Sequence, residues 1–432
     1  MNTQNNRIHL REFNWSLLTS LCVLSLIPAV YQVIRTFIIS TNAAPEVFDI
    51  LGQMEWYDLI DETLRAFLII PLYSVLNRIQ KHSPERFAAE VFKTGILTFA
   101  MYALFAAGVL LYGARLVRLM NPAEVDVATV SAYLGLENVA FMLEIVSSFA
   151  AVVFVVIGRA RNVYIFLAAR TLLTVAGDLV FIPRMGVYGV ALSNIIVNAL
   201  LAVVCVAILI AGKNIAASRF SMGDFALFKE WARVGAFSGI QQFIDNIFYA
   251  VMICKMVNMV AEQGNYWIAN NFIWGWLLIP VGALGEIIRR DCKDGYRSLR
   301  QGNYYFITAC IVMLWALTAP LWQGFYRHAE GLQNAGEIFS ITARLMPFYV
   351  AYALCVVIDS MFVGLGRTKY AMINSMIVNA GYYGIFYVLY KTGAVTMTMD
   401  TIILMFGFGM VVHLLVSLVE EKCFLRRETN IQ

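Results

Sequence analysis

Charged residues are scarce in this sequence. Asp, Glu, Lys and Arg make up 14% of the 432 residues, whereas hydrophobic residues make up 60% and the mean hydropathy is +0.70. A soluble domain carries roughly 25% charged and 45–50% apolar residues, so this composition excludes a soluble globular domain over most of the chain. Because a membrane-spanning helix needs about 20 mainly apolar residues, the length accommodates about twelve such helices.

Motifs that hold metals, disulfides or nucleotides are missing as well. The seven cysteines form no CxxC or His-linked spacing, so we expect neither a metal site nor a disulfide framework. P-loop, HExxH, GxSxG and glycine-rich dinucleotide patterns are also absent, and we expect no enzymatic activity and no cofactor. His413 stands alone in the last apolar segment and is interpreted as a helix-packing group. The net charge of +4 reflects loop composition and gives no reason to expect a nucleic-acid partner.

Long apolar segments follow one another along the whole chain. Their continuity predicts helices, because barrel strands would alternate between apolar and polar residues. The segments lie at residues 14–40, 52–77, 90–118, 127–157, 162–183, 187–212, 234–259, 265–288, 304–326, 338–364, 370–390 and 398–420. We therefore expect an all-α integral membrane protein with twelve transmembrane helices in a lipid bilayer.

Basic residues are unevenly distributed between the connecting segments. With the N-terminus placed on the cytoplasmic side, 22 of the 32 Lys and Arg residues fall in cytoplasmic segments and 5 in external loops. Cytoplasmic loops of membrane proteins carry such an excess. The sequence therefore predicts a multi-pass protein with both termini in the cytoplasm.

The second half of the chain repeats the first. "YQVIRTF" at residues 31–37 is similar to "QQFIDNI" at residues 241–247, an offset of 210. "FLIIPLYSVLNRI" pairs with "WLLIPVGALGEII" at an offset of 209, and "FVVIGRARNVY" with "FVGLGRTKYAM" at 208. Six spans per half make the repeat direct, with its axis along the membrane normal. We expect two six-helix bundles, an N-lobe at 1–212 and a C-lobe at 234–432, joined by a cytoplasmic linker at 213–233.

Part of the first half resembles a known transporter family. Gly158 and Arg159 follow the fourth span, Asp178 lies late in the fifth, and "GVYGVA" opens the sixth. This pattern resembles the multidrug and toxic compound extrusion (MATE) family of the multidrug/oligosaccharidyl-lipid/polysaccharide (MOP) exporter superfamily. The resemblance implies an antiporter that exports an organic, cationic or amphipathic compound against an inward flow of H⁺ or Na⁺. It also implies a monomer in the bacterial cytoplasmic (inner) membrane.

Two alternatives to an antiporter stay open. One is a flippase of lipid-linked oligosaccharides or polysaccharides from the same superfamily, in which buried arginines would meet phosphates. The other is a receptor or scaffold whose gene was merely duplicated. An acidic and aromatic cleft would favour the antiporter, and a strongly basic cleft would favour the flippase.

Buried carboxylates are the chemistry that the resemblance implies. Asp178 matches the family's fifth-span acidic residue and Asp245 the seventh-span one, while Asp359 lies about one helical turn from the tenth-span position. Arg35 stands where the family has a first-span aspartate. Because this replacement removes a Na⁺ ligand, we favour H⁺ as the coupling ion.

Polar side chains within apolar segments are the candidate site residues. A charge at the bilayer centre costs about 2.5–3.5 kcal/mol, so such residues face the bundle interior or a wet cavity. The candidates for ion coupling or substrate binding are Asp245, Asp359, Asp178, Arg35, Gln241, Gln242, Asn246 and Asn270. The candidates for an aromatic cleft lining are Tyr249, Trp274 and Trp276, with Trp267 and Tyr352 as further members.

Arg35 needs a partner of opposite charge at its depth. The resemblance places the first and fifth spans side by side, so Asp178 is one candidate partner, and Glu144 is another. The pair would be a static lock or would open when Asp178 is protonated; alternatively, Arg35 would bind an anionic substrate. In the second span, Asp61 and Arg65 have the i,i+4 spacing of a helical ion pair.

Prolines mark expected bends in three spans. Pro71 and Pro280 hold equivalent sites of the repeat, and we expect each to kink its helix. Pro28 lies two turns before Arg35, where a kink would bend the first helix.

Overall fold

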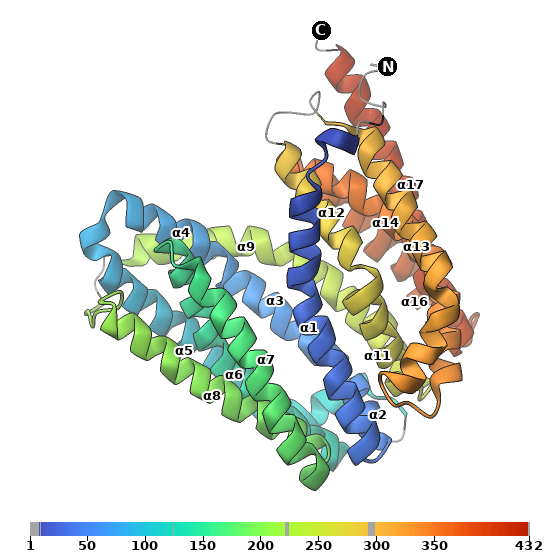
Figure 1. Ribbon diagram of the computed structural model, residues 1–432, viewed down its shortest axis with the longest axis horizontal. Helices are drawn as coiled ribbons and strands as arrows, with labels where there is room; N and C mark the ends of the chain where they lie inside the picture. The colour runs from blue at the N-terminus through green and yellow to red at the C-terminus, as the bar shows by residue number, and fades with distance from the viewer. Residues whose placement is uncertain (1–7, 9, 124, 221–223, 293–298, 431–432) are drawn as a thin grey trace. The chain divides into compact units, whose positions relative to one another are not determined.

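The computed structural model describes residues 8, 10–123, 125–220, 224–292 and 299–430. Within these ranges the regular structure is entirely helical, with no strand (Figure 1). The all-α architecture expected from the sequence is confirmed.

The first half of the chain contains the following elements. They are the 3₁₀ turn η1 (Leu10–Glu12), α1 (Trp15–Asn42), α2 (Glu46–Gln53), α3 (Glu55–Leu68), α4 (Ile70–His82), the 3₁₀ turn η2 (Pro84–Arg86), α5 (Phe87–Met120), α6 (Val127–Val156), α7 (Ala160–Met185) and α8 (Val187–Ala211).

The second half contains three π-helical segments among its α-helices. Its elements are α9 (Asp224–Tyr249), the π-helix η3 (Ala250–Cys254), α10 (Lys255–Met259), α11 (Gln263–Phe272), the π-helix η4 (Ile273–Leu277), α12 (Ile279–Asp291), α13 (Gln301–His328), α14 (Ala335–Gly364), α15 (Thr368–Met376), the π-helix η7 (Ile377–Tyr383), α16 (Gly384–Lys391) and α17 (Met399–Asn430).

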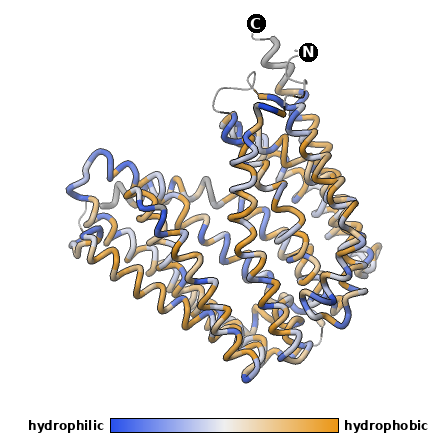
Figure 2. The backbone as a smooth tube through the Cα atoms, in the orientation of Figure 1, coloured by the Kyte–Doolittle hydropathy of each residue, from blue (hydrophilic) through white to orange (hydrophobic). Residues whose placement is uncertain are grey.

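Most of these helices are suited to cross a membrane. In the described ranges nine helices are long and apolar enough, and the bent pair Gln263–Leu277 and Ile279–Asp291 makes a tenth. The two other expected spans are helical too, in α3–α4 and α9–η3–α10, but are not among the helices that meet the combined criteria of length, hydropathy and charge. Twelve spans are therefore compatible with the structure. Hydrophobic residues cover most of each long helix, and hydrophilic residues gather in the turns (Figure 2).

The chain divides into two compact units. The N-unit is Ile38–Met259, and the C-unit combines Met1–Phe37 with Val260–Gln432. All but the last turn of α1 thus belongs with helices of the second half, while α9 packs against α3 and α4 of the first half. The lobes expected from the repeat, 1–212 and 234–432, instead place α1 with the first half and α9 with the second half. The division of the chain into two repeated lobes stays a prediction.

Small residues on α9 explain its close packing against α3. Gly235 and Gly239 are spaced four apart, so they lie on the same side of α9. A Cβ on Gly235 would lie 2.5 Å from the Phe67 carbonyl oxygen, and one on Gly239 would lie 2.4 Å from the Phe67 ring. Paired small residues of this kind let two helix backbones approach in a membrane. The Trp231 indole N–H adds a hydrogen bond of 3.1 Å to the Leu68 carbonyl.

The repeat recurs in the turns after α6 and α14. Gly158 and Gly366 adopt left-handed backbone conformations, with φ of +75° and +71°. In both turns the following arginine donates its backbone N–H to a carbonyl five residues back, Arg159 to Phe154 at 2.7 Å and Arg367 to Phe362 at 2.8 Å. Glycine tolerates this conformation because it lacks a Cβ, and the resulting motif ends a helix.

Two of the three expected proline effects are present as helix breaks. Pro71 lies in the first turn of α4, directly after α3 ends, and Pro280 lies in the first turn of α12. At the second break the span bends by 48°. Pro28 does not interrupt α1, which continues on both sides of it.

Candidate functional site

Four charged side chains form a chain through the N-unit. Arg65 Nε lies 2.5 Å from Asp61 Oδ2, and Arg65 Nη1 lies 3.5 Å from Glu144 Oε1. Arg170 Nη1 lies 2.5 Å from the same Glu144 oxygen. The charges alternate in sign and sum to zero, and they join α3, α6 and α7. We call these four residues the charge chain.

Neighbouring groups make further hydrogen bonds and contacts with the members of the charge chain. The Tyr102 hydroxyl donates to the second Asp61 oxygen, and Arg65 Nη1 donates to Ser148 Oγ at 2.9 Å. The Arg65 guanidinium also lies 5.8 Å from the centre of the Phe141 ring. Buried ion pairs need such additional bonds to offset the loss of water. The Asp61–Arg65 pair expected from the i,i+4 spacing is confirmed.

A second polar cluster lies in the C-unit. His413 Nε2 of α17 is 2.8 Å from Asp359 Oδ2 of α14, and Ser417 Oγ donates to the other Asp359 oxygen at 2.9 Å. Asn374 of α15 donates to Ser417 Oγ at 2.7 Å. This contact joins α17 to α14, as expected of a helix-packing group, and it gives His413 a carboxylate partner that the sequence did not indicate.

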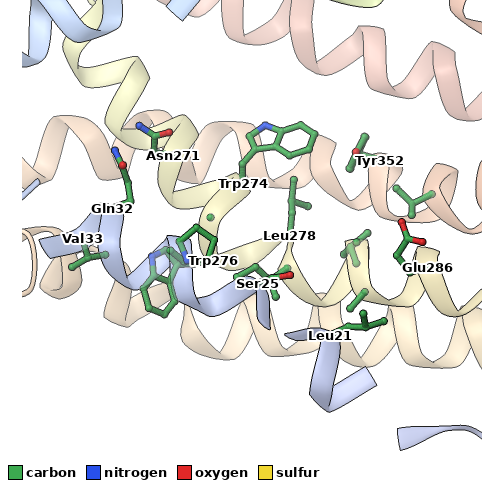
Figure 3. Close-up of a pocket in the computed structure, with 18 of the residues that line it drawn as sticks. Leu21, Ser25, Gln32, Val33, Asn271, Trp274, Trp276, Leu278, Glu286 and Tyr352 are labelled. Atoms are coloured by element: carbon green, nitrogen blue, oxygen red, sulfur yellow. The ribbon is translucent and has the colours of Figure 1, made fainter. Parts of the chain in front are cut away.

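A groove of about 690 Å³ also lies within the C-unit (Figure 3). One wall is a single face of α1, and the other comes from η4, α12 and α14. Trp276 and Ser25 of α1 both line the groove (Figure 3), and Trp274 makes an edge-to-face contact with Tyr352, with ring centres 5.5 Å apart. The α1 wall is formed by Leu21, Ser25, Pro28, Ala29, Gln32 and Val33. Grooves of roughly 300–1,000 Å³ accommodate drug-sized molecules.

Charged groups of the groove are mainly acidic. Glu286 and Arg289 form an exposed ion pair of 2.6 Å, and Glu330 lines the groove from the loop between α13 and α14. Glu330 is only 4% exposed, and burial raises the pKa of its carboxyl to about 8. Its carboxyl is therefore mostly neutral at pH 7, and a cation bound beside it would favour loss of the proton.

The charge chain and the groove occupy equivalent positions of the repeat. Adding the offset of 209 to Arg65 gives Trp274, and adding 208 to Glu144 gives Tyr352. The contact between the second and fourth spans is thus an ion pair of 3.5 Å in the N-unit and an aromatic pair of 5.5 Å in the C-unit. The same inter-helix contact has different chemistry in the two units.

The amides near Asp245 connect helices. Asn246 Nδ2 lies 3.0 Å from the Leu59 carbonyl, 3.1 Å from Thr63 Oγ1 and 3.2 Å from Glu62 Oε2. Gln242 donates to Asn246 Oδ1 at 3.1 Å. These bonds tie α9 to α3, which is a structural role. The Gln241 side chain lies outside the described residues.

The predicted charged residues are divided between the units. Asp178 is fully buried on α7 and Asp245 is half-buried on α9, both in the N-unit. Asp359 and Arg35 belong to the C-unit, where the Arg35 guanidinium lies 5.0 Å from the centre of the Tyr31 ring. The pairing of Arg35 with Asp178 stays a prediction. Glu144, the alternative partner, is engaged by Arg65 and Arg170.

The predicted aromatic residues are divided as well. Trp274 and Trp276 line the groove, and Asn270 lies on α11 next to the groove residue Asn271. Tyr249 belongs to α9 of the N-unit and is not among the groove residues.

Sequence reasoning missed several members of these clusters. Glu330 carried no signal, because it stands in a short loop. His413 and Ser417 did carry one, since their i,i+4 spacing places both on one face of α17.

Comparison with known proteins establishes the fold. Neither protein-family models nor curated proteins match the chain. Among solved structures, an inward-facing multidrug resistance MATE family transporter of the MOP superfamily is 16% identical with a TM-score of 0.75, covering 93% of this chain and 95% of the other. The lipid II flippase MurJ in an inward closed conformation is 12% identical with a TM-score of 0.72, covering 94% and 87%.

A third solved structure carries information about a binding pocket. It is a MOP superfamily transporter from Pyrococcus furiosus whose binding pocket is described as having reverse polarity. It is 15% identical with a TM-score of 0.63, covering 93% of each chain. The chain thus has the fold of MOP-superfamily transporters, and the fold implied by the sequence resemblance is confirmed.

Removal of Glu144 should destabilise the N-unit. The Glu144→Gln variant leaves Arg170 and one side of Arg65 without their shared anion. We expect the free energy of unfolding to fall by about 3 kcal/mol, the low end for breaking a buried pair, because Arg65 keeps Asp61. Chemical unfolding in detergent measures this change. The control Glu286→Gln, which breaks an exposed pair, should cost less than about 1 kcal/mol; equal losses would contradict a central role for Glu144.

Burial of Glu330 should make stability depend on pH. The pKa of its carboxyl is 4.5 in the unfolded chain and is raised to about 8 in the folded protein. The neutral carboxyl therefore contributes its full share to the free energy of unfolding below about pH 4.5, and this share is lost as the pH rises through about 8. Wild type should therefore lose thermal stability relative to Glu330→Gln between about pH 5 and 9. Melting temperatures across this range measure the difference. The exposed Glu337→Gln should run parallel to wild type; parallel curves for Glu330→Gln would refute the assignment.

Proposed function

We propose that the protein is a secondary active exporter of organic cations or amphipathic compounds. It would use alternating access, and a proton gradient rather than a sodium gradient would drive it. The observation that carries this proposal is the aromatic, acid-bearing groove of the C-unit in a chain with the fold of MOP-superfamily transporters. The protein would act as a monomer without enzymatic activity, in a bacterial cytoplasmic membrane with both termini inside.

The groove's chemistry supports a cationic substrate. At pH 7 Glu286 balances the single cation Arg289 and the Glu330 carboxyl is mostly neutral, so the lining would gain a net negative charge when a bound cation draws the proton from Glu330. Trp274 and Trp276 add indole rings, whose faces attract cations by about 0.5–2 kcal/mol. The apolar face of α1 on the opposite side suits the hydrocarbon part of an amphipathic compound.

The cluster around Asp359 supports proton coupling. Without a nucleotide-binding motif, transport would draw its energy from an ion gradient. Protonation of His413 would turn its hydrogen bond with Asp359 into an ion pair and strengthen the contact between α14 and α17. Loss of the proton would weaken that contact. Helix packing in the C-unit would thereby respond to the proton.

A lipid-linked oligosaccharide or polysaccharide flippase is the second candidate. Similarity to the lipid II flippase MurJ favours it, as do Arg65 and Arg170, which converge on one carboxylate oxygen and could meet phosphates. Asp61 and Glu144 already balance both arginines, however. The groove therefore supports cation export more strongly than the two arginines support a flippase, and export of a cation is the better-supported function.

Transport by proteoliposomes tests the proposal. A fluorescent organic cation should accumulate in vesicles when a pH gradient is applied and should leak out when a protonophore is added. Asp359→Asn and His413→Gln should each reduce gradient-driven accumulation about a hundredfold, the low end for losing one proton-transfer group, while dye binding persists. Asp400→Asn removes an exposed carboxylate of the same helix as His413 and should leave accumulation unchanged.

The opposite result would favour the flippase. No gradient-driven movement of any of several cations, together with loss of a surface glycan when the gene is deleted, would contradict cation export. Unaltered transport in both Asp359→Asn and His413→Gln would contradict the assigned proton site alone.

A further inference from the structure

Three helices of the N-unit end close to one another. α2 ends at Gln53, α5 ends at Met120, and α10 is the last turn of the helix that begins as α9. The Asn258 side chain on α10 connects the other two ends, because its Nδ2 lies 3.1 Å from the Met120 carbonyl oxygen and 3.4 Å from the Gln53 carbonyl oxygen. Three helix C-termini therefore converge at Asn258.

Three residues with buried amide side chains lie at or next to these helix ends. Gln53, Asn121 and Asn258 are only 8%, 4% and 2% exposed. Their side-chain oxygens are all buried, and no hydrogen-bond donor within the described ranges reaches any of them. Asn121 already uses its Nδ2 on the Val117 carbonyl, at 2.9 Å. A buried oxygen without a partner costs about 1–3 kcal/mol, so three together point to an occupant.

The electrostatics of the site favour a cation. The C-terminus of a helix carries partial negative charge, so three of them attract a positive ion. Amide and carbonyl oxygens are hard ligands of the kind that alkali and alkaline-earth ions prefer. The three amides are neutral, which suits a monovalent ion better than a divalent ion that seeks carboxylates.

We propose that the side-chain oxygens of Gln53, Asn121 and Asn258 bind a monovalent cation of the size of sodium. The ion ties the C-terminal ends of α2, α5 and α10 together and completes the coordination of oxygens that the protein leaves without donors. None of its ligands belongs to the charge chain, to the groove or to the Asp359 cluster, so the site is separate from those proposed to act in transport.

The position of the site gives it a stabilising role. On the orientation that the distribution of basic residues predicts, α5 and α10 run outward, so their C-termini lie at the external face. Sodium from the external solution would fix the packing of α10 against α2 and α5. Binding to the folded state alone raises the free energy of unfolding as the ion concentration rises.

Sodium titration of the full-length protein in detergent tests the site. The melting temperature is measured as sodium chloride replaces choline chloride at constant ionic strength, and we expect a saturable rise. Gln53→Met keeps the length of the side chain but removes its oxygen. It should weaken the apparent sodium affinity at least about tenfold, as expected when a metal site is altered, and Asn121→Leu should do the same.

Asn138→Leu is the matched control. Asn138 is also a fully buried amide of the N-unit, but both its polar atoms are bonded: Oδ1 accepts from Tyr57 at 2.6 Å and Nδ2 donates to the Ala106 carbonyl at 2.9 Å. This variant should melt at a lower temperature and keep the wild-type response to sodium. Loss of the sodium response in Asn138→Leu would count against the assignment to the three amides.

Direct binding settles the occupant even where a variant fails to fold. Equilibrium dialysis of wild type with radioactive sodium should show saturable binding, reduced in Gln53→Met or Asn121→Leu. The same melting temperature in sodium and choline, or saturable binding that neither substitution alters, would overturn the proposal. Equal melting temperatures in sodium and choline would mean that the side-chain oxygens of Gln53, Asn121 and Asn258 bind only water.

Discussion

A charged side chain within the bilayer must find a partner of opposite charge on a neighbouring helix. The cost of an isolated charge there is about 2.5–3.5 kcal/mol, so a chain with few charges can place them only where helices meet. The charge chain obeys this constraint: Asp61, Arg65, Glu144 and Arg170 alternate in sign across α3, α6 and α7. In doing so it fixes how these three helices pack in the N-unit.

The C-unit meets the same constraint in another way. At the positions equivalent to Arg65 and Glu144 it has Trp274 and Tyr352, which need no neutralising partner. The carboxyls of Glu286 and Glu330 stand at the groove, and that of Asp359 stands beside His413. The two charges of an ion pair neutralise each other and leave little for a ligand to bind. Indole faces and a neutral buried carboxyl, in contrast, stay available to a ligand. Under the proposed function, this difference would let the C-unit bind the substrate while the ion pairs brace the N-unit.

Local features of the fold could be predicted from the sequence. The helical segments, the break at Pro280 and the Asp61–Arg65 pair all follow from periodicity or from spacing within one helix. Gly158 and Gly366, aligned by the repeat, share a left-handed turn. Each of these depends on interactions among residues less than about two turns apart.

Contacts between distant helices could not be predicted in the same way. Arg65 and Glu144 are far apart in the sequence, and so are Asp359 and His413; their meeting depends on how each helix is rotated. The four-residue spacing of Gly235 and Gly239 marks a close-packing face of α9, but nothing in the sequence identifies α3 as its partner. The resemblance directed attention to Asp178 and Asp245, whereas the groove carboxylate Glu330 lies in a loop that no motif marks.

Photoaffinity labelling tests most directly whether the groove of the C-unit binds the exported compound. A photoreactive amphipathic cation would be bound to the full-length protein in membranes, and the labelled peptides identified by mass spectrometry. Labelling is expected on α1 between Leu21 and Val33 and on η4, and an excess of unlabelled cation should abolish it. Labelling confined to α3, α6 and α7, or labelling that unlabelled cation does not reduce, would contradict export through this groove.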